Sequence, residues 1–239
     1  MNKIHKSMIG IFVVLSIVAI AAQVGAASSP TMSLIDTTVP VQTHSDFYLN
    51  PGGTINLTLY VQNVNSLWSW KVNVTWNNSV LQLAPASSVI EGPFLSSNGT
   101  STTLFVEAPP TSGTIPEVSS TLLENSSVSG SGALMYIAFK PTILDVNTTI
   151  QIAGVRILNT AGNDIATLGP ISKAISIHFT GDINMDGIVN IKDISLVARQ
   201  FGTDTNSPNW KPVCDVNNDG KVDIRDISIV AKNFGMAYP

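Results

Sequence analysis

The C-terminal part of the sequence contains one pattern twice: Asp182-Ile-Asn-Met-Asp-Gly-Ile-Val-Asn-Ile-Lys-Asp193 and Asp215-Val-Asn-Asn-Asp-Gly-Lys-Val-Asp-Ile-Arg-Asp226. The match continues without a gap through Ile-Ser-Leu-Val-Ala-Arg-Gln-Phe-Gly202 and Ile-Ser-Ile-Val-Ala-Lys-Asn-Phe-Gly235. Internal repetition over such a length predicts two copies of one structural unit.

Each copy has the donor pattern of a calcium loop. Side-chain oxygens stand at the first, third, fifth, ninth and twelfth positions, and glycine stands at the sixth, where the chain must turn sharply. Ca²⁺ takes about six to eight oxygen ligands, and the seventh residue can supply its backbone carbonyl. The sequence therefore predicts two Ca²⁺ sites, with the ligands Asp182, Asn184, Asp186, Ile188, Asn190 and Asp193 in the first loop and Asp215, Asn217, Asp219, Lys221, Asp223 and Asp226 in the second.

An amphipathic helix is expected after each loop. Apolar residues recur there at spacings of three and four before a glycine that favours a helix end: Ile194, Val197, Ala198 and Phe201 before Gly202, and Ile227, Val230, Ala231 and Phe234 before Gly235. No helix is expected before either loop, because residues 174–180 alternate like a strand and Pro212 interrupts the other segment. The eighth residues, Val189 and Val222, are expected to point inward, where the loops can pair in a short β-bridge.

A calcium loop with a following helix and no preceding one resembles half of an EF-hand, and residues 181–236 resemble a dockerin. Dockerins are the small calcium-dependent modules by which proteins of prokaryotic cellulosomes and related surface assemblies bind cohesins. The resemblance implies a type I-like module with two Ca²⁺ and a partner-binding surface made of Ile191, Lys192, Ala198, Arg199, Ile224, Arg225, Ala231 and Lys232. The tenth and eleventh positions, often Ser-Thr in the best-known dockerins, are Ile-Lys and Ile-Arg here, so partner specificity is not carried over.

Residues 31–180 alternate with the period of two that is typical of half-buried strands. Apolar residues recur in this way in residues 54–61 and 68–76, and further strands are expected in residues 132–140 and 148–158. Turn clusters separate these segments, so a β-sandwich is predicted. Trp68, Trp70 and Trp76 share the parity of Val72 and Val74, and we expect them mainly in the core rather than in a row that stacks on sugars.

The predicted sandwich also resembles a cohesin. The segment Trp76-Asn-Asn-Ser-Val-Leu81 stands where cohesins carry Tyr-Asp-Pro-Ser-Val-Leu, and residues 132–139 follow the cohesin pattern Gly-x-Leu-x-x-Ile-x-Phe. Carbohydrate-binding modules share this jelly-roll architecture, so the fold alone does not choose between a dockerin and a polysaccharide as the ligand.

The N-terminal segment has the pattern of a secretory signal. Lys3 and Lys6 precede an apolar run, and small residues near Ala26 offer a cleavage site; an uncleaved membrane anchor is the alternative. Cys214 is the only cysteine, so the chain cannot form an internal disulfide. Glycosylation is possible at the Asn-x-Ser/Thr sites Asn56, Asn73, Asn77, Asn98, Asn125 and Asn147.

No catalytic pattern is recognised. The glutamates are Glu91, Glu107, Glu117 and Glu124, and no two stand where strand ends would place a catalytic carboxylate pair. No Gly-x-Ser-x-Gly or His-Glu-x-x-His motif occurs, and with a net charge of −4 no nucleic-acid partner is expected.

The sequence therefore predicts a signal peptide at residues 1–27, a mainly β, cohesin-like jelly-roll sandwich at 31–180 and a small α-helical dockerin at 181–239. The predicted function is a secreted or cell-surface, non-enzymatic adaptor of a cellulosome-like assembly that binds cohesin- or dockerin-bearing partners. The alternative is a carbohydrate-binding module that its dockerin attaches to a complex on polysaccharide.

Overall fold

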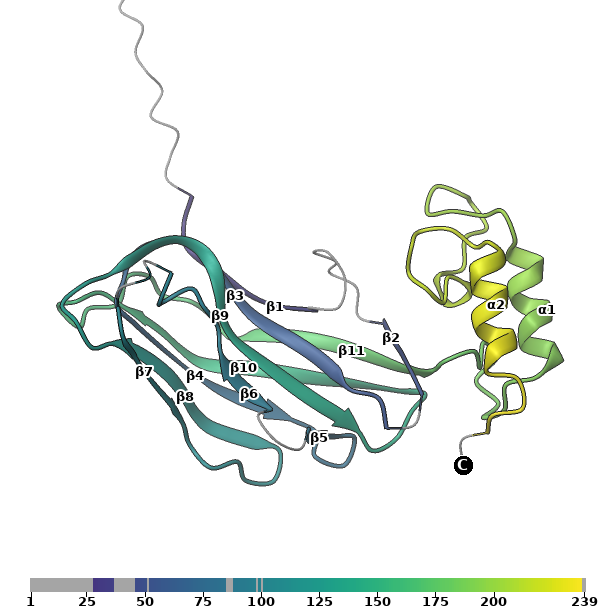
Figure 1. Cartoon of the computed structure of the whole chain (residues 1–239), viewed down its shortest axis with the longest axis horizontal. Helices are drawn as coiled ribbons and strands as arrows, with labels where there is room; N and C mark the ends of the chain where they lie inside the picture. The colour runs from purple at the N-terminus through teal and green to yellow at the C-terminus, as the bar shows by residue number, and fades with distance from the viewer. Residues whose placement is uncertain are drawn as a thin grey trace, which may run out of the picture.

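The structure is a computed structural model that describes residues 28–36, 46–50, 52–84, 88–97, 99 and 101–237. The predicted signal segment and Asn98 lie outside these residues. The described chain forms a β-sandwich followed by a small helical unit (Figure 1). We call residues 28–180 the sandwich and residues 181–237 the C-terminal module. In the described residues, no helix is both long and apolar enough to cross a membrane.

The sandwich consists of two sheets. The first holds β1 (Thr31–Asp36), β3 (Ile55–Leu67), β9 (Val128–Pro141) and β5 (Leu81–Leu83) in that order, with β6 (Val89–Glu91) also paired to β9. The second has the order β2 (Asp46–Leu49), β11 (Ile171–Phe179), β10 (Val146–Leu158), β4 (Ser69–Trp76), β8 (Thr114–Leu122) and β7 (Thr103–Glu107). Neighbouring strands are antiparallel except β2 and β11, which are parallel. The predicted mainly β sandwich is confirmed.

The inner faces of the two sheets form the main core. In β4, Trp70, Val72, Val74 and Trp76 are buried, and the residues between Trp70 and Trp76 that alternate with them are half-exposed. Trp70 and Trp76 are thus core residues, as predicted, and the Trp76 indole donates to the carbonyl of Leu81 at 2.9 Å. Trp68, just before β4, is only partly buried against the core.

Strand β3 is longer than its alternation predicts, because it runs six residues beyond Val61 to Leu67. The added part is mostly polar, its pairing with β9 shifts in register, and Asn63 and Ser66 have φ values of 57° and 61°. Bulges of this kind insert residues that break the period of two, so sequence alternation does not detect the continuation.

The C-terminal module contains α1 (Ile191–Gln200), the 3₁₀ helix η1 (Pro212–Cys214) and α2 (Ile224–Lys232). Figure 1 shows the two helices beside each other at one end of the sandwich. Their shared core is small and consists of Ile183, Val189, Val197, Cys214, Val216, Val222 and Val230 together with Phe179, the last residue of β11. Tyr48 and Leu144 of the sandwich pack against the same cluster.

Two expectations about the module are wrong in detail. Val189 and Val222 are buried, but they do not pair with each other: Val189 exchanges hydrogen bonds with residues 235 and 236, and Val222 with residues 202 and 203. Each loop thus pairs with the chain that leaves the other copy's helix. Phe201 and Phe234, expected on the apolar helix faces, are 57% and 56% exposed, since both helices end before reaching them. Ala198 and Ala231, expected on the same faces, are exposed as well, because the buried side of each helix is centred on Val197 or Val230.

Candidate calcium sites

The first carboxylate of the first loop organises its turn. Asp182 is 2% exposed, and its two oxygens accept hydrogen bonds from the amides of Asp186 (3.1 Å) and Gly187 (2.6 Å). Gly187 has a φ of 83°, in the left-handed region that favours glycine. The sharp turn expected at the sixth position is therefore present.

The last carboxylate of the same loop joins its two ends. Asp193 is fully buried; Oδ1 accepts the amide of Ile183 at 2.9 Å, and Oδ2 accepts the amide of Asn190 at 2.8 Å. Asn190 in turn caps α1, since its side-chain oxygen accepts the amide of Lys192 at 2.9 Å. This reciprocal capping box fixes the start of the helix relative to the loop.

The second loop repeats this arrangement. Asp215, 4% exposed, accepts the amides of Asp219 (3.1 Å) and Gly220 (2.9 Å). Asp226 is fully buried and accepts the amide of Asp223 at 2.8 Å, while Asp223 caps α2. The two copies therefore share hydrogen-bond geometry as well as sequence.

The buried carboxylates of both loops suit a hard cation. Burial raises the pKa of Asp182 and of Asp215, and the carboxylates of Asp193 and Asp226 nearby raise these values further. A divalent ion bound between such groups would offset both the desolvation and the repulsion, and carboxylate, amide and carbonyl oxygens are the donors that Ca²⁺ prefers.

Asparagine and backbone oxygens complete the predicted donor sets. In the described part of the chain, no three His, Cys, Asp or Glu side chains converge closely enough to hold a metal ion by themselves. The fit to Ca²⁺ rests on the full set of oxygens, including those of Asn184 and Asn217, and on the burial of the first and last carboxylates.

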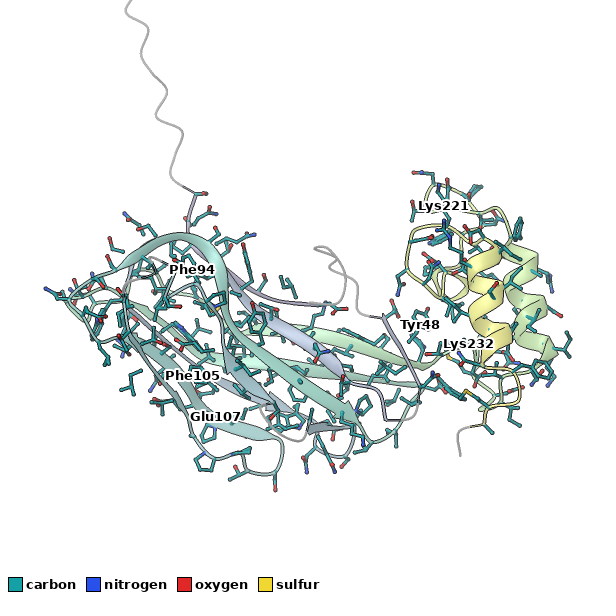
Figure 2. All side chains as sticks on the ribbon, in the orientation of Figure 1. Tyr48, Phe94, Phe105, Glu107, Lys221 and Lys232 are labelled. Atoms are coloured by element: carbon teal, nitrogen blue, oxygen red, sulfur yellow. The ribbon has the colours of Figure 1, made fainter. Side chains whose placement is uncertain are left out.

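The residues that the resemblance assigned to partner binding lie on the surface of the module. Ile191 and Ile224 are 63% and 62% exposed, and the exposed set also includes Lys192, Ala198, Arg199, Arg225, Ala231 and Lys232. Phe201 and Phe234, which follow α1 and α2, are exposed as well, and their equivalent positions in the two copies were the signal that could have identified them as surface residues. Figure 2 places Lys221 among the loops and Lys232 at the opposite end of α2.

The junction between sandwich and module was not predicted. Tyr48 of β2 stacks on His178 with ring centroids 5.1 Å apart, and His178 Nε2 lies 3.0 Å from Asp46 Oδ1. Burial and the negative charges of Asp46 and Asp215 raise the pKa of Tyr48. His178 and Asp215 lie far from Tyr48 in the sequence, so the sequence holds no local signal for this cluster. Figure 2 shows Tyr48 between the sandwich and the C-terminal module.

The remaining predicted positions lie on the sandwich. Of the possible glycosylation sites, Asn56, Asn77, Asn125 and Asn147 are exposed and Asn73 is half-buried. Three of the four glutamates accept hydrogen bonds within the sandwich. Glu91 accepts from Thr103 and Ser120. Glu117 accepts from Lys71, and Glu124 accepts from the amide of Thr102.

Comparison with known proteins finds different relatives for the two parts of the chain. Residues 180–235 match the family described as the dockerin type I domain, which confirms the resemblance of the C-terminal module. None of the curated proteins matches the chain. Solved cohesins are similar to the β part: a non-cellulosomal cohesin from the archaeon Archaeoglobus fulgidus has 19% identity and a TM-score of 0.42, covering 60% of this chain and 90% of that one. The second type II cohesin module of the ScaA scaffoldin from Acetivibrio cellulolyticus has 15% identity and a TM-score of 0.48. The match covers 61% of this chain and 95% of that one.

Proposed function

We propose that this chain is a secreted, non-catalytic adaptor of an extracellular assembly, whose C-terminal module binds two Ca²⁺ ions and a cohesin-bearing partner. One observation carries the proposal: a module that matches the dockerin type I domain folds two equivalent loops around buried carboxylates and presents an exposed apolar and basic surface after each. In this proposal the first 27 residues direct export.

Each ion would be held by the donors of one loop: Asp182, Asn184, Asp186, Ile188, Asn190 and Asp193, or Asp215, Asn217, Asp219, Lys221, Asp223 and Asp226. The bound ion would supply positive charge to carboxylates that the fold already buries. Because Asp193 and Asp226 also belong to the capping boxes of α1 and α2, fixing the loops also fixes the helices.

The partner surface combines apolar side chains with positive charge. Ile191 and Lys192 stand exposed at the end of the first loop, and Arg199 and Phe201 stand exposed at the end of the helix that follows. The second copy repeats this composition. Aromatic side chains and arginine are enriched at protein–protein interfaces. A partner with an apolar face bordered by acidic groups fits this chemistry, and the repeat offers it two similar faces.

In this proposal the sandwich receives a dockerin-bearing partner. The rival hypothesis, a carbohydrate-binding module, gains no support from the tryptophans of β4, because Trp70 and Trp76 are buried in the core. Without an exposed aromatic row there, sugar stacking has no evident platform on that strand.

Affinity purification tests both parts of the proposal. The full chain without its first 27 residues is immobilised and exposed to the secretome of its source in Ca²⁺ or in chelator, and a parallel sample is incubated with insoluble cellulose, chitin and xylan. We expect calcium-dependent capture of cohesin-bearing proteins by the module, capture of dockerin-bearing proteins by the sandwich, and no retention on the polysaccharides. Retention on a polysaccharide without protein capture would instead favour the carbohydrate-binding hypothesis.

A further inference from the structure

Both calcium loops contain an ion pair between a predicted ligand and a predicted partner-surface base. Lys192 Nζ lies 3.2 Å from Asp186 Oδ2, and Arg225 Nη1 lies 2.8 Å from Asp219 Oδ2. In each copy the base is the eleventh residue of the loop and the carboxylate is the fifth. The bases are 70% exposed and the carboxylates about half as much, at 35% and 30%.

The pair persists although the two loops differ around it. The base is lysine in one copy and arginine in the other, and the seventh and ninth residues differ as well. The fifth-position carboxylates have the same other partners in both copies: Oδ1 accepts the amide of the seventh residue, and Oδ2 also accepts the side-chain amide of the third. The base is therefore a constant part of the environment of each fifth-position ligand.

Helix electrostatics make the position of these bases unfavourable unless a carboxylate compensates. Lys192 and Arg225 are the second residues of α1 and α2, where the helix dipole places partial positive charge and disfavours cations. By contrast, Arg199 and Lys232 lie in the last turns, where cations are favoured, and neither makes an ion pair within the part of the chain that the structure describes. The fifth-position carboxylate thus serves two purposes, as a ligand and as the counter-charge of the base.

We infer that Lys192 and Arg225 are counter-cations built into the calcium loops, each of which lowers the Ca²⁺ affinity of its own loop. The inference rests on the proposed calcium function. A Ca²⁺ ion bound to the fifth-position carboxylate shares this carboxylate with the base, and the two positive charges repel each other. Calcium binding to a loop therefore weakens the ion pair between the base and the carboxylate. Coupling of this kind is reciprocal: a partner acid that draws the base away raises the calcium affinity of the loop.

The expected effect is moderate because the bases are exposed. Coulomb repulsion between a divalent ion and a base about 6 Å away in a water-like medium corresponds to roughly a three- to tenfold weakening of affinity at low salt. Salt at 0.1 M or more should shrink the effect, since the screening length is then about 10 Å or less.

The test is a calcium titration of the full chain by calorimetry, with three proteins compared. These are the unchanged protein, the double variant Lys192→Met with Arg225→Met, and the matched control Arg199→Met with Lys232→Met. Both double variants remove the same charge from the same two helices, but only the first removes the ion pairs. Melting in saturating Ca²⁺ checks that each is folded, and Lys192→Gln with Arg225→Gln replaces the first variant if it is not.

We expect the ion-pair variant to bind Ca²⁺ about three- to tenfold more tightly than the unchanged protein at low salt, and the control to change by less than about twofold. Equal shifts in the two double variants, or no shift in either, would overturn the inference. Failure of the unchanged protein to bind Ca²⁺ would instead overturn the proposed function, so the two outcomes are distinguishable.

Discussion

The sandwich buries large apolar side chains from two sheets, whereas the C-terminal module buries four carboxylates beside a much smaller apolar cluster. A unit of about 60 residues or fewer has little core to stabilise it, and the chain has no disulfide to help. The contrast predicts two sources of stability within one chain: apolar burial for the sandwich and, if the proposed calcium sites are filled, ion binding for the module.

Removing calcium tests this contrast most strongly. A loop at a thousandfold excess of ion over its Kd gains about 4 kcal/mol of stability, so chelation should unfold most of the module and leave the sandwich intact. Far-UV circular dichroism should lose the helical signal, while limited proteolysis should yield a resistant sandwich fragment. Full helicity in chelator would show that the module does not depend on metal.

The reverse perturbation removes a core side chain from the sandwich. Phe139 is fully buried and contacts Trp76 edge-on, with ring centroids 5.3 Å apart. Phe139→Ala should lower the free energy of unfolding of the sandwich by about 3 to 5 kcal/mol, whereas calcium affinity should not change. Ile90→Ala is the control, because Ile90 is 50% exposed and its truncation should change stability by less than about 0.5 kcal/mol. Thermal unfolding and calcium titration of both variants provide the comparison.

The junction sharpens the comparison because Phe179 belongs to a sandwich strand but packs in the module core. Phe179→Ala should weaken apparent calcium binding, since about 3 kcal/mol or more of module stability is lost. Phe47→Ala, at a buried position of β2 in the sandwich core, should lower the melting temperature of the sandwich and leave calcium binding nearly unchanged. Calorimetric calcium titration of the two variants tests this difference. An equal loss of calcium affinity in both would contradict the assignment of Phe179, and not Phe47, to the core of the module.

The smallest expected effect concerns the two loops themselves. The second loop has Asp223 at the ninth position where the first has Asn190, and additional ligand charge favours calcium. We expect the second loop to bind more tightly, by a factor of about three to ten. In calorimetry, Asp186→Ala should leave the tighter site and Asp219→Ala the weaker one; the opposite order would show that ligand charge does not rank the loops.

The parts that sequence predicted are those that depend on local spacing. The turns of the two loops were predictable because each glycine has a fixed position relative to the carboxylates around it, and β4 because its tryptophans and valines share one parity. That the loops bind Ca²⁺ through the predicted donors stays a prediction. The amphipathic pattern also predicted α1 and α2, but it misplaced Phe201. That residue follows the last residue of α1 with a ψ of 131°, so it leaves the helical phase that the spacing assumes.

Features that depend on distant parts of the chain were not predictable. The pairing of Val189 with residues 235 and 236 requires knowledge of where α2 ends in space. The same holds for His178, whose partner Asp46 lies far away in the sequence. The pairs of Lys192 and Arg225 with their loops are local, yet spacing alone does not show whether an exposed base bonds or remains in solvent.

The direct passage from β11 into the first loop has a mechanical consequence. Phe179 ends the strand and Asp182 begins the loop, so tension between a partner held by the sandwich and one held by the module would run along β11. That strand is bonded to β2 and β10 on its two sides, which distributes the load. The first loop would bear the same force through a few hydrogen bonds and, if it binds calcium, one ion. The force needed to unfold the junction would then depend on the calcium concentration.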